Sequence, residues 1–330
     1  MPGARRAEDK YDIRASSVQS WMEAQGPLAL HEAYKTYDDE RILDGLWAQA
    51  DYFAHHVAIF PRLGMINNWT SMPNEWLGEG EKSITPQRHD HLLQAFPYLY
   101  HYTGWDDVAE RYRAFVATKG WVPDSFQQVI SWERENVPKR TKAPEAITDL
   151  SVVGADRSGI TLAWTSPRDD GPAGRAARYF VKYSDKPIVE FAPTDNPARD
   201  VEKRRVVSEV EDGILADWSQ KKKNAASGNT AQPKGAFRPE VSSGAPHHPD
   251  WHKVDAFWMA EHVAGEPGPA PAGAAESFTI RELRPHAWFG AARQPTVGDL
   301  KRGAYYVAIC SWDDERNLSR VSNVVRFELR

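Results

Sequence analysis

Residues 159–165 read GITLAWT and residues 178–184 read RYFVKYS, and these two stretches decide the fold of the C-terminal half. In both, every second side chain is large and apolar, which is typical of a β-strand with one face in a core. Residues 304–312 repeat the pattern. We expect a single core from the alternate residues of the three strands, namely Ile160, Leu162, Trp164, Tyr179, Val181, Tyr183, Tyr305, Val307 and Ile309.

Further short strands are predicted on either side of these stretches. They cover residues 146–153, 258–263, 277–283 and 320–328, with turn residues between them. Seven short strands are the number expected for a β-sandwich. An insertion at about 188–252, rich in charge and in Pro, Gly and Ala, interrupts the pattern. We expect a surface excursion with a short amphipathic helix at 206–218, the alternative being disorder over 221–243.

This half of the chain resembles the fibronectin type III family. The early strands of that family are matched by PEAITDL (144–150), ITLAWTSP (160–167) and RYFVKYS. The late strands of its bacterial members are matched by GEP (265–267), ESFTI (276–280), YYVA (305–308) and SNVV (322–325). The resemblance implies an all-β sandwich over residues 144–330. The insertion and a long connection at 285–303 depart from the family pattern.

Residues 1–143 are predicted to be helical. Apolar side chains at intervals of three and four residues predict helices within 28–57, broken at residues 37–40, where Asp38 or Asp39 caps the second helix. A second pair is predicted at 91–102 and 105–118, and Gly104 suits the break between them. The two pairs look like an internal repeat in which Tyr37 aligns with Tyr102. A long loop at 61–85 connects them.

This helical pattern resembles the hairpin repeat of the (α/α) toroid enzymes. In residues 28–120, each apolar helix ends in a Tyr and, after a short turn, the next helix opens with acidic residues. The toroid enzymes are glycosidases and polysaccharide lyases that act in a cleft lined by helix ends and loops. A complete toroid needs more helices than 143 residues hold, so the resemblance implies part of a toroid or a smaller helical domain. The predicted fold class is multidomain, with N-terminal all-α hairpins and a C-terminal all-β sandwich.

The candidate catalytic residues are Tyr52, His56 and His89. Tyr52 and His56 lie one helical turn apart, and a lyase needs a base and a Tyr or His that protonates the leaving oxygen. His89 and Asp90 precede a helix and would face the cleft of a toroid. The alternative for all of these side chains is helix capping or packing.

The candidate substrate-binding residues are Asn67, Asn68, Trp69, Trp76 and Asp90. A loop Trp offers a flat apolar face to a sugar ring, and an Asn amide can bridge two hydroxyls. The alternative is that both Trp side chains anchor the loop onto the helices.

No cofactor and no metal site is predicted. His89 and His91 are two residues apart at a helix start and face away from each other, and the His247, His248 and His252 group is expected in a solvated loop. The single Cys310 excludes an internal disulfide and a Cys-based zinc site, and it is expected on the sheet face opposite to the core. The sequence lacks the motifs of P-loop NTPases, α/β-hydrolases and zincins.

The charge balance gives no reason to expect a nucleic-acid partner. The 41 Lys and Arg against 46 Asp and Glu leave a net charge of −5. No apolar stretch is long enough to span a membrane, and no signal peptide precedes the first helix. Family resemblance alone implies an extracellular or periplasmic location.

Two functions are compatible with these patterns. The first is the C-terminal portion of a secreted carbohydrate-active enzyme, a polysaccharide lyase or glycoside hydrolase, with a polysaccharide or glycan as partner and the sandwich as a buttress. The alternative is a non-enzymatic extracellular or cell-surface binding or scaffold protein.

Overall fold

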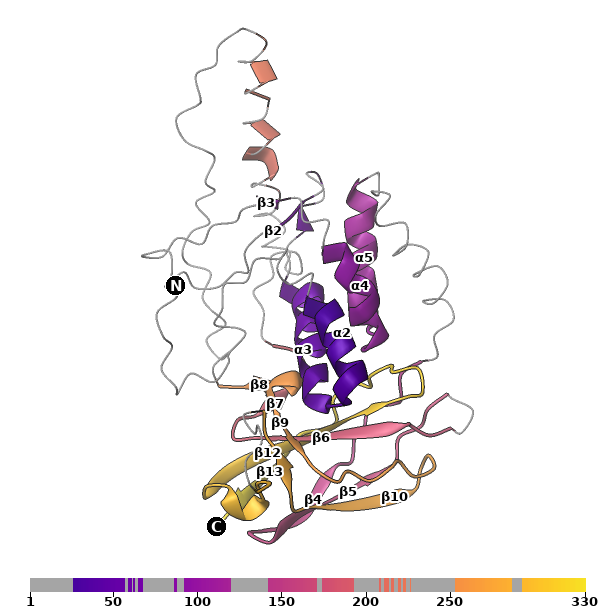
Figure 1. The fold of residues 1–330 in the computed structure, drawn as a ribbon, viewed down its shortest axis with the longest axis vertical. Helices are drawn as coiled ribbons and strands as arrows, with labels where there is room; N and C mark the ends of the chain where they lie inside the picture. Colours follow the sequence, from indigo (N-terminus) through magenta and orange to yellow (C-terminus); the bar gives the residue numbers. More distant parts are fainter. Residues whose placement is uncertain are drawn as a thin grey trace.

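The structure is a computed structural model that describes residues 26–56, 92–119, 142–170, 174–192, 253–286 and 293–330. Shorter pieces are described at 59–60, 62, 65–67 and 86–87, with eleven further residues between 208 and 226, all of them helical. Helices dominate the N-terminal part and antiparallel sheets dominate the C-terminal part, as predicted. In Figure 1 the helices stand against one side of the sheets. In the part of the chain described, no helix has the length and apolar character that a membrane crossing requires.

The helices of the described segments 26–56 and 92–119 follow the predicted breaks. They are α2 (Gly26–Tyr37), α3 (Glu40–Asp51), α4 (Leu92–His101) and α5 (Asp106–Lys119), and one turn of π-helix, Tyr52–His56, continues α3. Asp39 starts α3, because its carboxylate accepts a hydrogen bond from the Arg41 backbone N–H at 3.0 Å. Gly104 has a positive φ of 60° between α4 and α5, a conformation that favours glycine.

A short sheet accompanies the helices, which the prediction of an all-α unit did not include. It consists of β1 (Ile59–Phe60), β2 (Met65–Asn67) and β3 (Pro86–Gln87), in the order β1-β2-β3. The region expected to be a loop at 61–85 therefore contains β2. In Figure 1, β2 and β3 lie toward the end of the helices that points away from the two large sheets.

Two antiparallel sheets build the C-terminal part. The first contains β4 (Ser151–Asp156), β5 (Gly159–Thr165) and β10 (Ala275–Ile280) in the order β10-β5-β4. The second has the order β11-β9-β6-β12-β13, formed by β6 (Arg178–Ser184), β9 (Glu261–Val263), β11 (Leu283–Arg284), β12 (Gly303–Trp312) and β13 (Val325–Leu329). A parallel pair, β7 (Ile188–Val189) and β8 (Asp255–Ala256), joins the two ends of the insertion.

The strand bounds differ from the prediction in several places. The strand expected at 277–283 is divided, because β10 ends at Ile280 and Leu283 belongs to β11 of the other sheet. β4 starts at Ser151 and the last strand starts at Val325, so both are shifted toward the C-terminus. The strand expected at 258–263 begins at Glu261, because Phe257–Met259 forms a 3₁₀ turn.

The two sheets share one core, as the alternation predicted. All nine expected residues are buried in it, and Ile280, Leu283, Phe327 and Leu329 complete it. Trp164 packs edge-on against Tyr179 with ring centres 5.4 Å apart. The Tyr179 hydroxyl donates to Glu276 at 2.5 Å, so the polar end of this side chain is satisfied.

The other face of the five-stranded sheet is also buried, because the helices cover it. Trp47 of α3 packs edge-on against Phe180 and Trp312, at ring-centre distances of 5.0 and 6.0 Å. The Trp47 indole N–H donates to the Tyr102 carbonyl at 3.0 Å. Cys310 is buried in the same cluster, on the face predicted for it. A sheet buried on both faces explains why RYFVKYS is apolar beyond simple alternation.

Candidate functional site

Helix α3 presents a row of buried acidic side chains to the five-stranded sheet. Glu40, Asp44 and Asp51 lie on the side of the helix that carries Trp47, since spacings of four, three and four residues return to one face. All three carboxylates are almost completely buried. Buried carboxylates need paired charges or several hydrogen bonds, so the sheet must supply partners.

Asp44 is the centre of the larger polar group, which we call the Asp44 cluster: Asp44, Lys182, His262, His286 and Glu261. Lys182 of β6 forms an ion pair with Asp44 Oδ1. Nε2 of His262, on β9, and Nε2 of His286, two residues after β11, each lie 2.6 Å from Asp44 Oδ2. Four segments far apart in the sequence therefore meet at one carboxylate.

Electrostatics follow from this geometry. Burial alone raises the pKa of the Asp44 carboxyl, but His262 and Lys182 outweigh burial and hold that pKa well below its usual range. For His286 burial acts in the other direction and lowers the pKa, yet its hydrogen bonds to Asp44 and Glu261 raise that pKa to about 9. Burial lowers the pKa of His262 and of Lys182, with Asp44 acting in the opposite direction.

Each of the two imidazoles has a second carboxylate at its other nitrogen. His286 Nδ1 lies 2.7 Å from Glu261 Oε2, which also accepts the His286 backbone N–H at 2.6 Å. His262 Nδ1 lies 3.6 Å from Glu40 Oε2, beyond hydrogen-bond range, and among the described residues neither atom has a hydrogen-bond partner. Arg178 pairs with the other oxygen of Glu40.

Aromatic rings close the cluster on the side of the helices. The Lys182 ammonium lies 5.4 Å from the centre of the Trp47 ring and 5.1 Å from that of Phe257. Rings at this distance stabilise a buried cation through their electron-rich faces. The Lys182 and His262 side chains are 0% exposed, whereas His286 is 35% exposed and forms the solvent side of the cluster.

Asp51 forms a second buried centre two helical turns further along the same face of α3. Its carboxylate accepts hydrogen bonds from His55 Nδ1 at 2.5 Å, from the Trp258 indole at 2.8 Å and from the Ala192 backbone at 2.9 Å. His55 Nε2 lies 3.5 Å from Asp107. The side chains of Asp51 and His55 are both buried. Asp51 joins α3 to the segments that follow β7 and β8 through Ala192 and Trp258.

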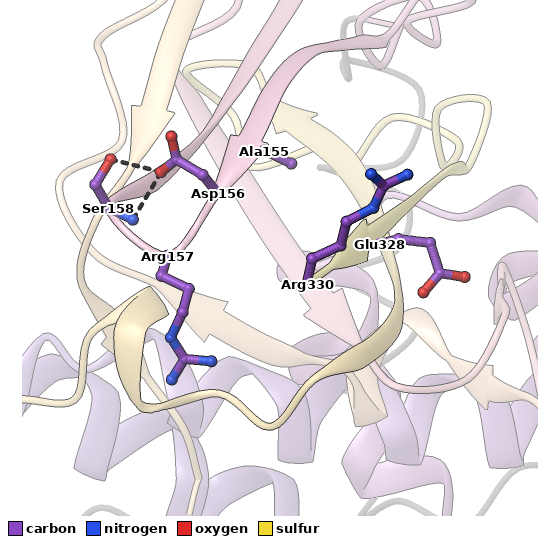
Figure 2. Close-up of a pocket in the computed structure, with 6 residues that line it drawn as sticks. All are labelled: Ala155, Asp156, Arg157, Ser158, Glu328 and Arg330. Carbon is purple, nitrogen blue, oxygen red and sulfur yellow. Dashed lines mark hydrogen bonds between the residues drawn. The ribbon is translucent and has the colours of Figure 1, made fainter.

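The surface also has an open depression at the far end of the sheets, shown in Figure 2. It is lined by Ala155, Asp156, Arg157, Ser158, Glu328 and Arg330. Asp156 accepts hydrogen bonds from the Ser158 backbone at 2.7 Å and its hydroxyl at 2.5 Å, which is the chemistry of a tight turn between β4 and β5. Asp156 and Ser158 therefore serve the turn, while Arg157 donates to the Gly298 carbonyl and Glu328 pairs with Arg326.

The predicted site residues fall largely outside this picture. Tyr52 and His56 lie at the two ends of the π-helical turn, and Asn67 ends β2; only their backbone is described. Asn68, Trp69, Trp76, His89 and Asp90 lie outside the described residues.

The Asp44 cluster was not predicted from the sequence. One signal was visible, since Glu40 and Asp44 interrupt the apolar stripe of α3 that carries Leu43 and Trp47. Lys182 gave no signal, because a Lys in a strand normally faces water. Two imidazoles and a carboxylate converging at one point can hold a proton or a metal ion.

Neither the protein-family models nor the curated proteins with which the chain was compared contain a match to it.

Proposed function

We propose that the chain is part of a carbohydrate-active enzyme of the polysaccharide lyase or glycoside hydrolase type, in which the C-terminal sheets support the helices as a buttress. One observation carries the buttress role: the outer face of the five-stranded sheet is buried under α3 through the Asp44 cluster and the Trp47 contacts. A sandwich that acts as an independent binding module keeps its outer faces in water. In this chain the helices cover the outer face of the five-stranded sheet.

The strand order supports the fibronectin type III interpretation of these sheets. β4 and β5 pair in one sheet with the later strand β10, while β6 pairs with β12 in the other. Early strands divided between two packed sheets in this way are the arrangement of sandwich domains of this type. The insertion leaves and re-enters the fold through the β7–β8 pair, so it lengthens a connection without breaking a sheet.

The carbohydrate assignment is supported by where the candidate residues stand. Asn67 ends β2, which lies toward the end of the helices that points away from the buttress (Figure 1). Tyr52 and His56 follow the C-terminal end of α3. In toroid enzymes, helix ends and loops line the cleft, so a buttress at the opposite end leaves such a cleft open to a polymer. π-Helical turns are frequent at functional sites, which adds to the interest of Tyr52.

The test is depolymerisation of a panel of uronic-acid and neutral polysaccharides. A lyase gives unsaturated products that absorb in the ultraviolet, and a hydrolase gives new reducing ends without that absorbance. We expect activity on at least one polymer, and a loss of about 10²-fold or more in Tyr52→Phe or His56→Asn, the range for a general acid or base. His31→Gln, on α2, is the matched control and should keep its activity.

The outcomes separate the proposal from its alternative. Binding to a polysaccharide without any product would overturn the enzyme assignment and favour the scaffold protein. Activity that survives in both variants would keep the enzyme class but remove Tyr52 and His56 as its catalytic residues. If the chain neither binds nor degrades any polysaccharide of the panel, the carbohydrate proposal as a whole is overturned.

A further inference from the structure

Three metal-binding side chains meet in the Asp44 cluster. One ligand atom each of Asp44, His262 and His286 lies within 4.8 Å of the others. The three come from α3, from β9 and from the segment after β11, which are held together by the packing of the helices on the sheet. Two of the three ligands, Asp44 and His262, are therefore held by a helix and a strand, and His286 joins them from the turn after β11.

The number of protons that the two imidazoles need in the absence of a metal ion favours a bound cation. An ionised Asp44 can only accept, so both Nε2 atoms need a proton to bond to it. His286 then carries protons on both nitrogens, since its Nδ1 also faces Glu261. His262 Nδ1 is left buried at 3.6 Å from Glu40 Oε2, with no hydrogen bond to either atom. Buried polar atoms without partners are rare and need an explanation.

A metal ion removes the need for a proton on Nε2 of either imidazole. With the proton of each imidazole on Nδ1, toward its carboxylate, both Nε2 lone pairs and Asp44 Oδ2 converge as three donor atoms. A carboxylate behind the distal nitrogen of each histidine is the usual outer arrangement of a histidine metal site, because it fixes the tautomer and the ring orientation. Glu261 and Glu40 occupy these two positions.

We propose that Asp44, His262 and His286 bind a divalent first-row metal ion, with Zn²⁺ as the best match to two imidazoles and one carboxylate. Lys182 remains on Asp44 Oδ1 and leaves Oδ2 for the metal. Zn–N and Zn–O bonds of about 2.0–2.1 Å place ligand atoms roughly 3.3 Å apart, so each imidazole moves outward by less than about 1 Å.

Access fits a bound cation, and the groups nearest the three ligand atoms do not oppose one. With neutral imidazoles, Asp44 and Glu261 outnumber the Lys182 ammonium, whereas Glu40, behind His262, faces both Arg178 and, at 3.9 Å, Arg284. His286 is 35% exposed, so an ion has a route from water and a solvent ligand can complete the coordination. This inference does not depend on the carbohydrate proposal, and it differs from the sequence-based expectation of no metal.

The experiment uses the full chain, stripped with EDTA, dialysed and then titrated with Zn²⁺. We expect one Zn²⁺ per chain by elemental analysis, and a rise in the melting temperature on addition of Zn²⁺. Co²⁺ as a probe should give visible absorption with nitrogen-ligand intensity. His262→Asn and His286→Asn should lose stoichiometric binding, and Glu261→Gln should weaken affinity by about 10–100-fold. His31→Gln, a histidine outside the cluster, should bind as the unaltered chain does.

Two results would overturn the proposal: no retained Zn²⁺ and no shift in melting temperature in the unaltered chain, or full stoichiometry in both histidine variants. If a histidine variant fails to fold, the Co²⁺ spectrum of the unaltered chain decides, because a spectrum of hexa-aquo Co²⁺ alone excludes inner-sphere imidazole ligands. Elemental analysis of the protein before EDTA treatment identifies which metal it acquires in the cell and separates Zn²⁺ from Fe²⁺.

Discussion

Replacement of Asp44 by Asn tests the electrostatic reasoning most directly. Asn has the same shape as Asp, so packing is preserved while the negative charge disappears. Lys182 is 0% exposed and then retains a buried positive charge without its counter-ion. Removing one partner of a buried ion pair costs about 3–5 kcal/mol, and we expect a loss of unfolding free energy in this range.

A double-mutant cycle measures the coupling energy between Asp44 and Lys182 directly. Lys182→Met removes the ammonium but leaves Asp44 its two imidazoles, so we expect a loss of about 1–3 kcal/mol, the value of a hydrogen bond to a charged group. The double variant should lose less than the sum of the two, with a coupling energy of about 2–3 kcal/mol. The reason is that neither charge is then left alone in the interior.

Equilibrium unfolding in urea with EDTA present provides the assay, followed by tryptophan fluorescence and by circular dichroism. EDTA ensures that only the protein's own charges contribute. Additivity of the two single variants within about 0.5 kcal/mol would refute the pairing of Lys182 with Asp44. A loss below about 1 kcal/mol for Asp44→Asn would refute the burial of that pair.

Three further outcomes are expected. In metal-free protein, His286 has a pKa raised from 6.5 to about 9. The stabilisation that its protonated form provides is therefore complete below pH 6.5 and is lost as the pH rises through 9. Between pH 6 and 10, the unfolding free energy of the unaltered chain should fall by about 1–2 kcal/mol more than that of His286→Asn, after allowance for solvent screening. Trp47→Ala should lower the unfolding free energy, measured in urea, by about 3–5 kcal/mol, because Trp47 is 1% exposed between helices and sheet. Val153 is 62% exposed, so Val153→Ala should change the unfolding free energy by no more than about 0.5 kcal/mol. Cys310 is buried and burial raises the pKa of its thiol well above the usual value, so it should react with a thiol reagent only when the chain is unfolded in urea; rapid labelling of the native protein would contradict its position under the helices.

The sequence was sufficient to predict the two-sheet core but not the contact between sheets and helices. The alternation in GITLAWT and RYFVKYS shows which side chains of each strand share a face. Trp164 and Tyr179 lie in the core, as this pattern predicted. The breaks at Asp39 and Gly104 are local too. Short-range chemistry therefore predicted the helices and most of the strands.

The Asp44 cluster depends on what covers the second face of a strand. Lys182 alternates with core residues, and by itself that position is equally suited to water. Its burial is decided by a helix 138 residues earlier in the chain. Glu40 and Asp44 on an apolar stripe indicated buried charge, but the identity of the partners is a tertiary fact. The π-helical turn after α3 and the three short strands likewise have no periodicity long enough to read.

The order in which the chain is synthesised gives the Asp44 cluster a further consequence. Asp44 leaves the ribosome 242 residues before His286. At about 5–20 residues per second, the carboxylate waits on the order of 10–50 s for the last of its partners. During that interval the acidic face of α3 is open to water and to other chains. Folding of the helices on the sheet is thus held back until residue 286 has been translated, and nascent chains arrested before that residue should be recognised by chaperones.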